Sequence, residues 1–203
     1  MAVEIGDKAE AECKSNQEIA VTRKPIGYVI PVLRLLTFAA TLSATLVMAL
    51  NKQTKTFVVA TVGTTPIKAT FTAKFSHTPA FVFFVIANGM ASFHSILMLV
   101  IELFGHKYDL KGLRFVIIPI LDIFTVALIS GAANAAAFMG ELGRNGNSHA
   151  RWNKICDRFK KYCDHGSAAM LVSFIAVLIL IIITAISILK LHKRNSTSYS
   201  TLH

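Results

Sequence analysis

Charged side chains are scarce in this sequence, at 16% of 203 residues, and several long windows contain almost none of them. A soluble domain usually carries about 25% charged residues and is less apolar than the 54% found here. The mean hydropathy of +0.56 agrees with this difference. The surplus of apolar side chains is therefore expected to face lipid instead of a protein core.

Cysteines and catalytic motifs are also few. Three cysteines are too few for a disulfide-rich scaffold or a zinc module. The sequence has no Ser-His-Asp arrangement, no metal-ligand cluster and no phosphate-binding loop. We therefore expect no enzymatic activity, no catalytic or metal-binding residues and no cofactor. The formal charge of +10 does not predict nucleic-acid binding, because the basic residues are spread over all polar connections.

Four long apolar stretches dominate the rest of the chain. They cover residues 29–50, 80–104, 113–139 and 168–191, and each reaches the roughly 20 residues that cross a hydrocarbon core. Backbone groups find no water in lipid, so these stretches are expected to be helices. The prediction is an all-α membrane protein with one four-helix transmembrane domain over residues 29–191. Residues 1–28 and 192–203 form tails, and the polar amino tail lacks the pattern of a cleaved signal peptide.

The connections between the spans indicate the topology. Four spans place both tails on one side and the long connections 51–79 and 140–167 on the other, while 105–112 is a short link. The positive-inside rule does not decide the orientation, since each side carries ten Lys and Arg residues when Arg34 is left out. The close pair Cys156 and Cys163 in the second long connection suits an oxidising exterior. We therefore expect both termini in the cytosol.

Two charges of opposite sign lie inside predicted spans. Arg34 lies in the first span and Asp122 in the third, at comparable depth in the inner half of the bilayer. A buried charge needs a partner in lipid, and an ion pair between the two is the simplest arrangement. Two alternatives stay open: Arg34 reaching the interface alone, and Asp122 as a neutral carboxyl. His94 is expected to form interhelical hydrogen bonds, and Glu102 to reach water near the cytosolic end.

Small residues recur at four-residue spacing on three of the predicted helices. Such stripes let helix backbones approach closely in lipid, which favours helix association. The contacts are either within the four-helix bundle or with a second copy, and the sequence leaves both open. The stripes are Ala40 and Ala44 in the first span, Ala87, Ala91 and Ser95 in the second, and Ala127, Gly131 and Ala135 in the third.

The second long connection has aromatic and apolar residues at steps of three or four. Trp152, Ile155, Phe159 and Tyr162 follow this pattern, which predicts a short external amphipathic helix. Its contact residues would be Arg151, Trp152, Phe159 and Tyr162. We expect a Cys156–Cys163 disulfide, because two free external thiols are uncommon. In one straight helix these cysteines lie about 10.5 Å apart along the axis, so the bond requires the helix to end or bend before Cys163.

These residues together resemble a known family. The matching features are Arg34, Asp122 and the loop string Gly146-Asn-Ser-His-Ala-Arg-Trp152-Asn-Lys-Ile-Cys156, followed by Phe159, Tyr162 and Cys163. The chain resembles the plant Casparian strip membrane domain protein-like family, distantly akin to MARVEL tetraspan proteins. Thr-Phe-Val-Val-Ala-Thr-Val-Gly at 56–63 is similar to the first subgroup of these CASP-like proteins. The first long connection differs from that of the founding members in carrying Lys52, Lys55, Lys68 and Lys74.

The resemblance implies a plasma-membrane tetraspan that forms homo- and hetero-oligomers with itself and related tetraspans. In the founding members such assemblies are immobile platforms that position proteins for local cell-wall modification. The leading hypothesis is therefore a membrane scaffold without nucleic-acid partners. The alternative is a small channel or transporter that uses Arg34, His94, Glu102 and Asp122. A third hypothesis is an adaptor whose Ser/Thr/Tyr-rich tail at 195–203 is phosphorylated.

Overall fold

The structure is a computed structural model that describes residues 28–104 and 113–200, with side chains described for 28–104 and 116–192. Several expectations lie outside these residues. They concern the amino tail up to residue 27, the short link 105–112, and the side chains of the carboxyl tail beyond His192.

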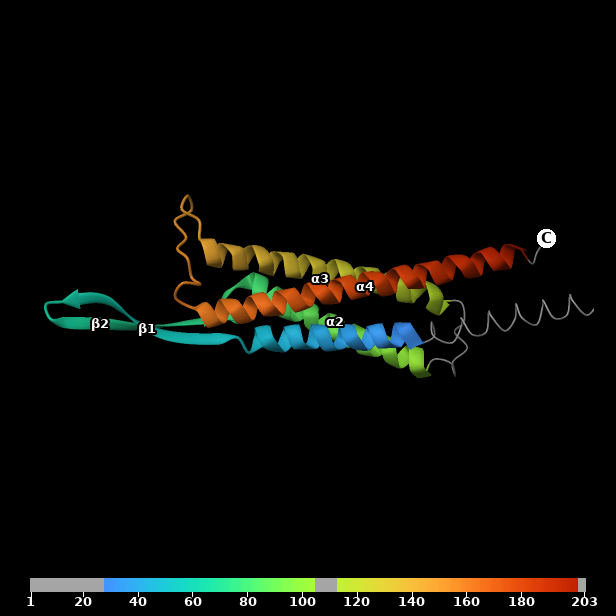
Figure 1. The fold of residues 1–203 in the computed structure, drawn as a ribbon, viewed down its shortest axis with the longest axis horizontal. Coiled ribbons are helices and arrows are strands. Elements are labelled where there is room, and N and C mark those ends of the chain that lie inside the picture. Colours follow the sequence, from blue (N-terminus) through green and yellow to red (C-terminus); the bar gives the residue numbers. More distant parts are fainter. Residues whose placement is uncertain (1–27, 105–112, 201–203) are drawn as a thin grey trace, which may run out of the picture.

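Four helices run along the molecule, and each is long and apolar enough to cross a membrane. The first spans Tyr28–Ala49. It is followed by α2 (Pro79–Phe104), α3 (Leu113–Asn145) and α4 (Lys160–Ser200) (Figure 1). The predicted helical membrane class is confirmed. Both α3 and α4 extend beyond the predicted spans, and α4 continues into the segment that was expected to be a tail.

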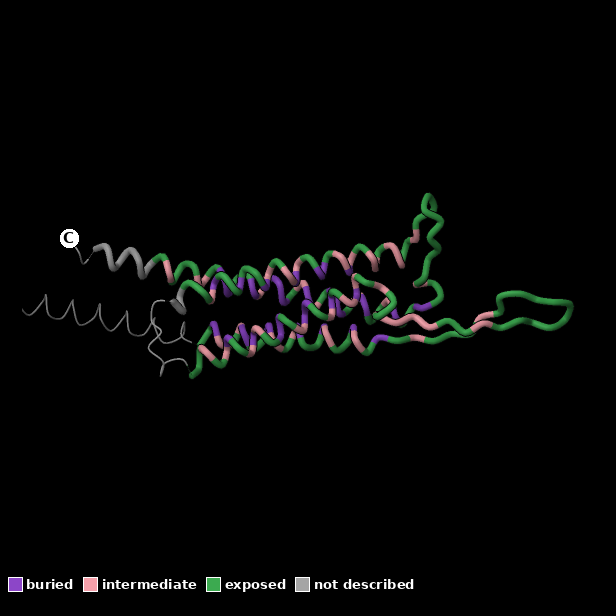
Figure 2. Tube along the Cα trace, turned by 180° about the vertical axis from the view of Figure 1, so that it is seen from behind, coloured by how far each residue is buried: buried purple, intermediate pink, exposed green. Residues whose placement is uncertain are grey.

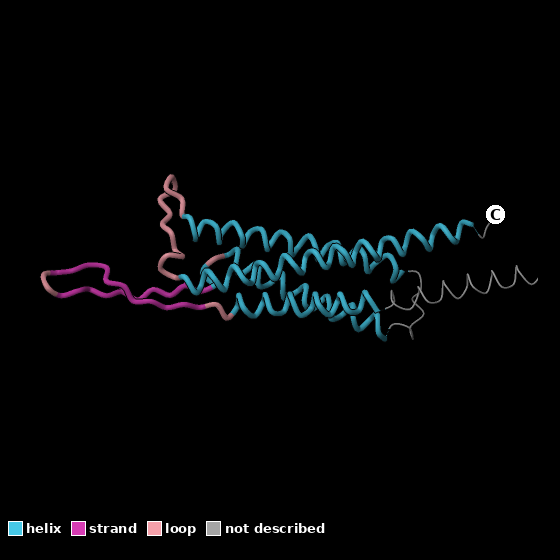
Figure 3. Tube along the Cα trace, viewed as in Figure 1, coloured by secondary structure: helices cyan, strands magenta, loops and turns pink. Residues whose placement is uncertain are grey.

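The helices lie side by side as an up-and-down bundle. The start of the Tyr28–Ala49 helix and the carboxyl end of α4 lie at one end, called here the tail end (Figure 1). Both long connections lie at the opposite end, called here the loop end (Figure 3). Because both long connections lie together, every contact between them takes place at the loop end.

The first long connection is a β-hairpin, which the sequence analysis did not predict. Strand β1 (Lys52–Val62) pairs antiparallel with β2 (Thr65–Lys74), with Lys52 opposite Lys74 and a bulge between Val58 and Ala60. Gly63 has a φ of +63° in the connecting turn, a conformation that glycine adopts without a steric penalty. A 3-10 turn, η1 (Phe75–His77), leads into α2. The hairpin projects from the bundle along its long axis (Figure 3).

The core follows the inward faces of the helices. Figure 2 shows the buried residues along these faces, with the hairpin largely exposed. One hydrophobic cluster at the loop end contains Met48, Phe84 and Met170. A second contains Ile129, Leu180 and Ile183, all fully buried. The outward faces carry large exposed apolar side chains, among them Leu46, Phe93, Phe124, Leu171 and Leu178, as expected for surfaces in contact with lipid.

The prediction of an amphipathic helix in the second long connection is wrong. Residues 146–159 form bends and turns around an isolated antiparallel bridge between Asn147 and Trp152. Regular helix starts only at Lys160, as the first turn of α4. The three- and four-residue spacing of the aromatic residues arises from two different elements, since Phe159 ends the loop and Tyr162 belongs to α4.

Candidate functional site

Arg34 and Asp122 form an ion pair inside the bundle. Arg34 Nη1 donates to Asp122 Oδ1 at 3.1 Å, and Nη2 donates to Oδ2 at 2.8 Å. This two-pronged geometry is the strongest that a guanidinium and a carboxylate make. Arg34 is 2% exposed and Asp122 is fully buried. The structure thus pairs the two charges singled out in the sequence. The two alternatives, Arg34 alone at the interface and Asp122 as an unpaired carboxyl, are not found.

Helix α2 adds two groups to the pair. His94 Nε2 lies 2.8 Å from Asp122 Oδ1, and a carboxylate only accepts, so Nε2 is the donor. Arg34 Nε lies 3.6 Å from Glu102 Oε2, whose side chain is one-third exposed. The charge cluster, defined as Arg34, His94, Glu102 and Asp122, therefore connects the first helix to both α2 and α3. Glu102 contacts Arg34, a role that the sequence analysis did not assign to it.

A small cavity adjoins the charge cluster toward the tail end. Its volume is about 110 Å³, and its lining includes Arg34, Glu102, Pro119 and, from α4, Ser187 and Lys190. The fully buried apolar residues Ile129, Leu180 and Ile183 belong to one hydrophobic cluster with Ile30, which lies one turn before Arg34 on the first helix. The charged groups thus contact one another beside packed apolar residues of the bundle.

The stripes of small residues face in different directions. Ala87, Ala91 and Ser95 on α2 are buried within the bundle, as is Ala44 on the first helix. On α3 the buried small residues are instead Ala132, Ala133 and Ala136. The predicted stripe of Ala127, Gly131 and Ala135 lies on the other face: Ala127 and Gly131 are exposed and Ala135 is half-buried. A Cβ added at Gly131 would meet no atom within 4 Å.

The outward face of α3 also carries an amide. Asn134 is exposed, and its Nδ2 donates to the backbone carbonyl of Ser130 at 2.8 Å. In a span, this places a strongly polar group on the surface beside the small-residue stripe. We call Ala127, Gly131, Asn134 and Ala135 the α3 face. Small residues with a hydrogen-bonding side chain beside them are the composition of helix–helix contacts in membranes.

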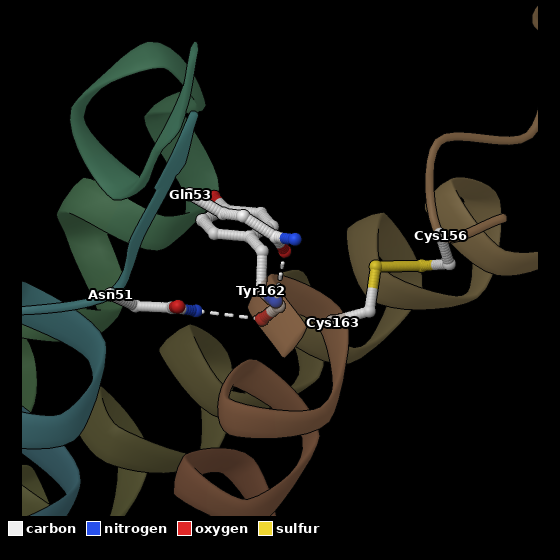
Figure 4. The surroundings of a disulfide bond; sticks show 5 residues. All are labelled: Asn51, Gln53, Cys156, Tyr162 and Cys163. Atoms are coloured by element: carbon white, nitrogen blue, oxygen red, sulfur yellow. Dashed lines mark hydrogen bonds between the residues drawn. A yellow bond between two sulfur atoms is a disulfide. The ribbon is translucent and has the colours of Figure 1, made fainter. Parts of the chain in front are cut away.

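A disulfide joins the second long connection to α4. Cys156 and Cys163 are bonded, with their Cα atoms 5.7 Å apart (Figure 4). The bond forms because the chain turns between the loop and the first turn of α4, the change of direction that the sequence analysis required. Phe159 and Tyr162 are buried against the bundle, whereas Arg151 and Trp152 are exposed.

The loop itself is held by local hydrogen bonds. Asn147 and Trp152 exchange two backbone hydrogen bonds, both 2.9 Å long. Asn147 Oδ1 accepts from the backbone amides of His149 and Ala150. Gly146 has a φ of +69°, and a Cβ there would lie 2.7 Å from the carbonyl oxygen of Trp152. The Gly146-to-Trp152 string singled out in the sequence is therefore a tight turn that requires glycine at its start.

The sequence analysis missed two polar side chains, one just before β1 and one at its start. Asn51 Nδ2 donates to the carbonyl of Tyr162 at 2.7 Å, and Gln53 Oε1 accepts from the amide of Tyr162 at 2.9 Å (Figure 4). The amides in the first turn of a helix have no partner within it, so Gln53 caps α4 from another element. Nothing in the local pattern at 51–53 signals a contact with a residue more than a hundred positions away.

The two long connections also pack against each other. The rings of Phe57 and Phe159 meet edge to face with centroids 6.0 Å apart, and the Arg158 guanidinium lies 5.4 Å from the Phe57 ring centroid. Deeper in the bundle, Ser173 Oγ donates to Asn88 Oδ1 at 2.8 Å, which joins α4 to α2. The loop end is thus one connected unit of hairpin, second loop and helix ends.

Comparison with known proteins gives consistent matches. The chain matches the Casparian strip membrane protein domain over residues 23–179. It is 58% identical to CASP-like protein 1B1 of Populus trichocarpa over 191 residues, covering 94% of this chain and 95% of that protein. It is 59% identical to CASP-like protein 1B1 of Arabidopsis thaliana over 169 residues, covering 83% of this chain and 86% of that protein. No solved structure matches the chain.

Proposed function

This chain belongs to the Casparian strip membrane protein family, and from that premise we propose that it is a plasma-membrane scaffold that assembles laterally with copies of itself and related tetraspans. The family resemblance noted in the sequence is confirmed by the match over residues 23–179. The scaffold would have both termini in the cytosol and its loop end outside the cell. The assembled patches would hold proteins that modify the adjacent cell wall.

The observation that carries this proposal is the α3 face. The other small-residue stripes are used inside the bundle, whereas Ala127 and Gly131 are exposed on the surface of a span. Helices in lipid gain no hydrophobic driving force from association, so close backbone approach and interhelical hydrogen bonds supply the attraction. An exposed strip of small residues with an amide beside it provides both. A second copy or a related tetraspan is the partner that such a strip fits.

The charge cluster supports a structural role over transport. The guanidinium and the carboxylate are paired in two-pronged geometry, with His94 and Glu102 also in contact with the pair. Transporters use titratable chains or broken helices near the midplane, whereas the charged groups here are paired with one another beside the packed apolar residues Ile30, Ile129 and Ile183. We expect reconstituted protein to pass no ion or small solute above the level of empty liposomes.

The test of lateral assembly is fluorescence recovery after photobleaching on a carboxyl-terminal fusion in plant cells. We expect slow recovery confined to patches for the natural sequence. Gly131→Leu places a bulky side chain on the α3 face and should give faster recovery and uniform distribution. Gly89→Leu is the matched control, since Gly89 also lies in a span and an added Cβ there meets nothing within 4 Å.

Equal recovery of Gly131→Leu and the natural protein would remove the α3 face as the contact surface. Fast, uniform recovery of the natural protein would contradict self-assembly altogether. The orientation is tested separately with an epitope inserted at Gly63 in the hairpin turn. Staining of intact cells is expected, and staining only after permeabilisation would reverse the proposed topology.

A further inference from the structure

The loop end contains a cavity that neither the charge cluster nor the α3 face involves. Its volume is about 330 Å³. Its walls come from the end of the first helix, the start of α2, the end of α3, the second loop and the start of α4. Segments far apart in the sequence therefore converge around one space, which is called here the loop-end cavity.

The lining of the loop-end cavity is apolar and polarisable. The aromatic side chains Phe81, Trp152 and Tyr162 lie in it together with Met48, Met139 and Met170. Thioethers interact favourably with aromatic rings, and rings attract other rings edge to face or offset. The polar residues of the lining are Asn51, Thr78, Asn153 and Ser167, together with Arg144, which is exposed. Their amides and hydroxyls are enough to orient a ligand through one hydrogen-bonding substituent.

Glycines keep the cavity wide. Gly140, Gly143 and Gly166 all belong to its lining. A Cβ on Gly143 would meet Cys156 Sγ at 3.8 Å, and one on Gly166 would meet Asn51 Nδ2 at 3.7 Å, both ordinary contacts. Alanine therefore fits at either position without a clash, and the added methyl group would sit among residues that line the space. Gly140 is tighter, since its Cβ would lie 3.0 Å from Met170 Cε.

The position of Trp152 is imposed by an unusual backbone. Arg151 has a φ of +54°, the only positive value among the described non-glycine residues, and Gly146 has +69°. Positive φ in a non-glycine residue is unfavourable and recurs at ligand-binding sites. Here it precedes a tryptophan that is 55% exposed although it also lines the cavity. The indole thus lies between the cavity and its surroundings.

We propose that the loop-end cavity binds a small, neutral aromatic molecule of one or two rings with one hydrogen-bonding substituent. An apolar cavity of about 150 Å³ holds a benzene-sized molecule, and ligand sites begin at about 300 Å³. The size thus fits one or two rings. The aromatic and thioether walls favour rings over a saturated chain. The proposal is independent of lateral assembly, because the cavity and the α3 face are separate sets of residues.

Trp152 provides the assay, because it is the single tryptophan of the chain. Purified full-length protein in detergent micelles is titrated with 4-nitrobenzyl alcohol, a neutral ring compound that quenches tryptophan fluorescence. The expected result is saturable quenching. The concentration of benzyl alcohol that displaces half of the quencher should be at least fivefold lower than that of cyclohexylmethanol, which has the same hydroxymethyl group on a saturated ring. Quenching that rises linearly without saturation would show partition into the micelle and overturn the proposal.

Cavity-filling variants locate the binding. Gly143→Ala and Gly166→Ala should each weaken the binding of 4-nitrobenzyl alcohol about threefold, and the double variant about tenfold. Gly89→Ala on α2 is the control and should bind as the natural protein does. Equal affinity in all variants would place the quencher elsewhere and overturn the proposal. If dioctanoylphosphatidylcholine displaced the quencher at lower concentration than benzyl alcohol does, the occupant would be a lipid chain, and the proposal would also be overturned.

Discussion

Removing one charge of the Arg34–Asp122 pair should destabilise the bundle strongly. Asp122→Asn keeps the size of the side chain but leaves the Arg34 guanidinium, 2% exposed, without its main counterion. Breaking a buried pair on one side costs about 3–5 kcal/mol. Glu102 still lies 3.6 Å from Arg34 Nε and compensates in part. We therefore expect a loss of about 3 kcal/mol in the free energy of unfolding, at the lower end of that range.

The double variant Arg34→Met with Asp122→Leu provides the sharper test. Arg34→Met alone leaves Asp122 fully buried with only His94 as partner, and should also cost about 3 kcal/mol. Replacing both partners by apolar residues removes both charges at once. The remaining loss of stability then comes from the missing hydrogen bond to His94 and from imperfect packing. The double variant should then be no less stable than either single variant. The coupling energy is expected to be about 3 kcal/mol, at the upper end for contacting residues.

The measurement is the free energy of unfolding in mixed micelles, from titration with a denaturing detergent followed by far-UV circular dichroism. Thr41→Val serves as the control, because Thr41 is fully buried but its hydroxyl bonds only to carbonyls of its own helix. Its effect should be small and additive with Asp122→Asn. A loss below about 1 kcal/mol for Asp122→Asn, or additive costs in the double variant, would refute the ion pair as a stabilising connection between helices.

Three further predictions concern the loop end. Gly146→Ala should destabilise the loop by about 1–3 kcal/mol, because the added Cβ clashes with the Trp152 carbonyl. Gly63→Ala also places a side chain at positive φ but in open space, so it should cost less. Trp152 emission reports the difference, and equal effects of the two substitutions would contradict the clash. Reduction of the disulfide, or Cys163→Ser, should lower the free energy of unfolding by about 2–3 kcal/mol. The measurement is the same detergent titration with and without reductant. An unchanged free energy would mean that the bond does not restrict the unfolded chain. Gln53→Ala should cost about 1 kcal/mol and speed hydrogen exchange of the Tyr162 amide in the first turn of α4, and unaltered exchange there would exclude its capping role.

Much of the membrane part follows from the sequence, because lipid restricts the options of the chain. A long apolar stretch in a bilayer has to satisfy its own backbone, so the four helices and their order are predictable. The same reasoning predicts a partner for Arg34 and Asp122, since few other arrangements tolerate charges at that depth. The outward direction of the α3 stripe is different. In the structure, the face with Ala132, Ala133 and Ala136 packs into the bundle, which leaves the stripe on the outside. Both faces of α3 carry small residues, so periodicity alone does not predict which face is buried.

The loop end shows where sequence patterns stop being sufficient. The spacing of Trp152, Phe159 and Tyr162 is helical, yet the chain that leads to Trp152 is held in a turn by Asn147. The chain after Trp152 is held by bonds from the amides of Ile155 and Cys156 to the Gly143 carbonyl and by the disulfide. Local hydrogen bonds by an Asn side chain compete with helix, and here they prevail. The hairpin was missed for a related reason. Its Thr- and Val-rich strands have high β-propensity, but a two-stranded sheet is marginal alone, and the Phe57–Phe159 contact supports it.

The hairpin has a consequence for the distance at which other molecules meet this protein. Strand β1 has 11 residues, which at about 3.4 Å per residue gives a length of roughly 35 Å. Phe57, the middle residue of β1, is held against the second loop, so the stretch from Val58 to Val62 extends past this support. A surface facing the loop end would therefore touch the hairpin tip before any helix. A patch assembled as proposed would act as a layer of spacers, with a gap set by strand length and not by the membrane.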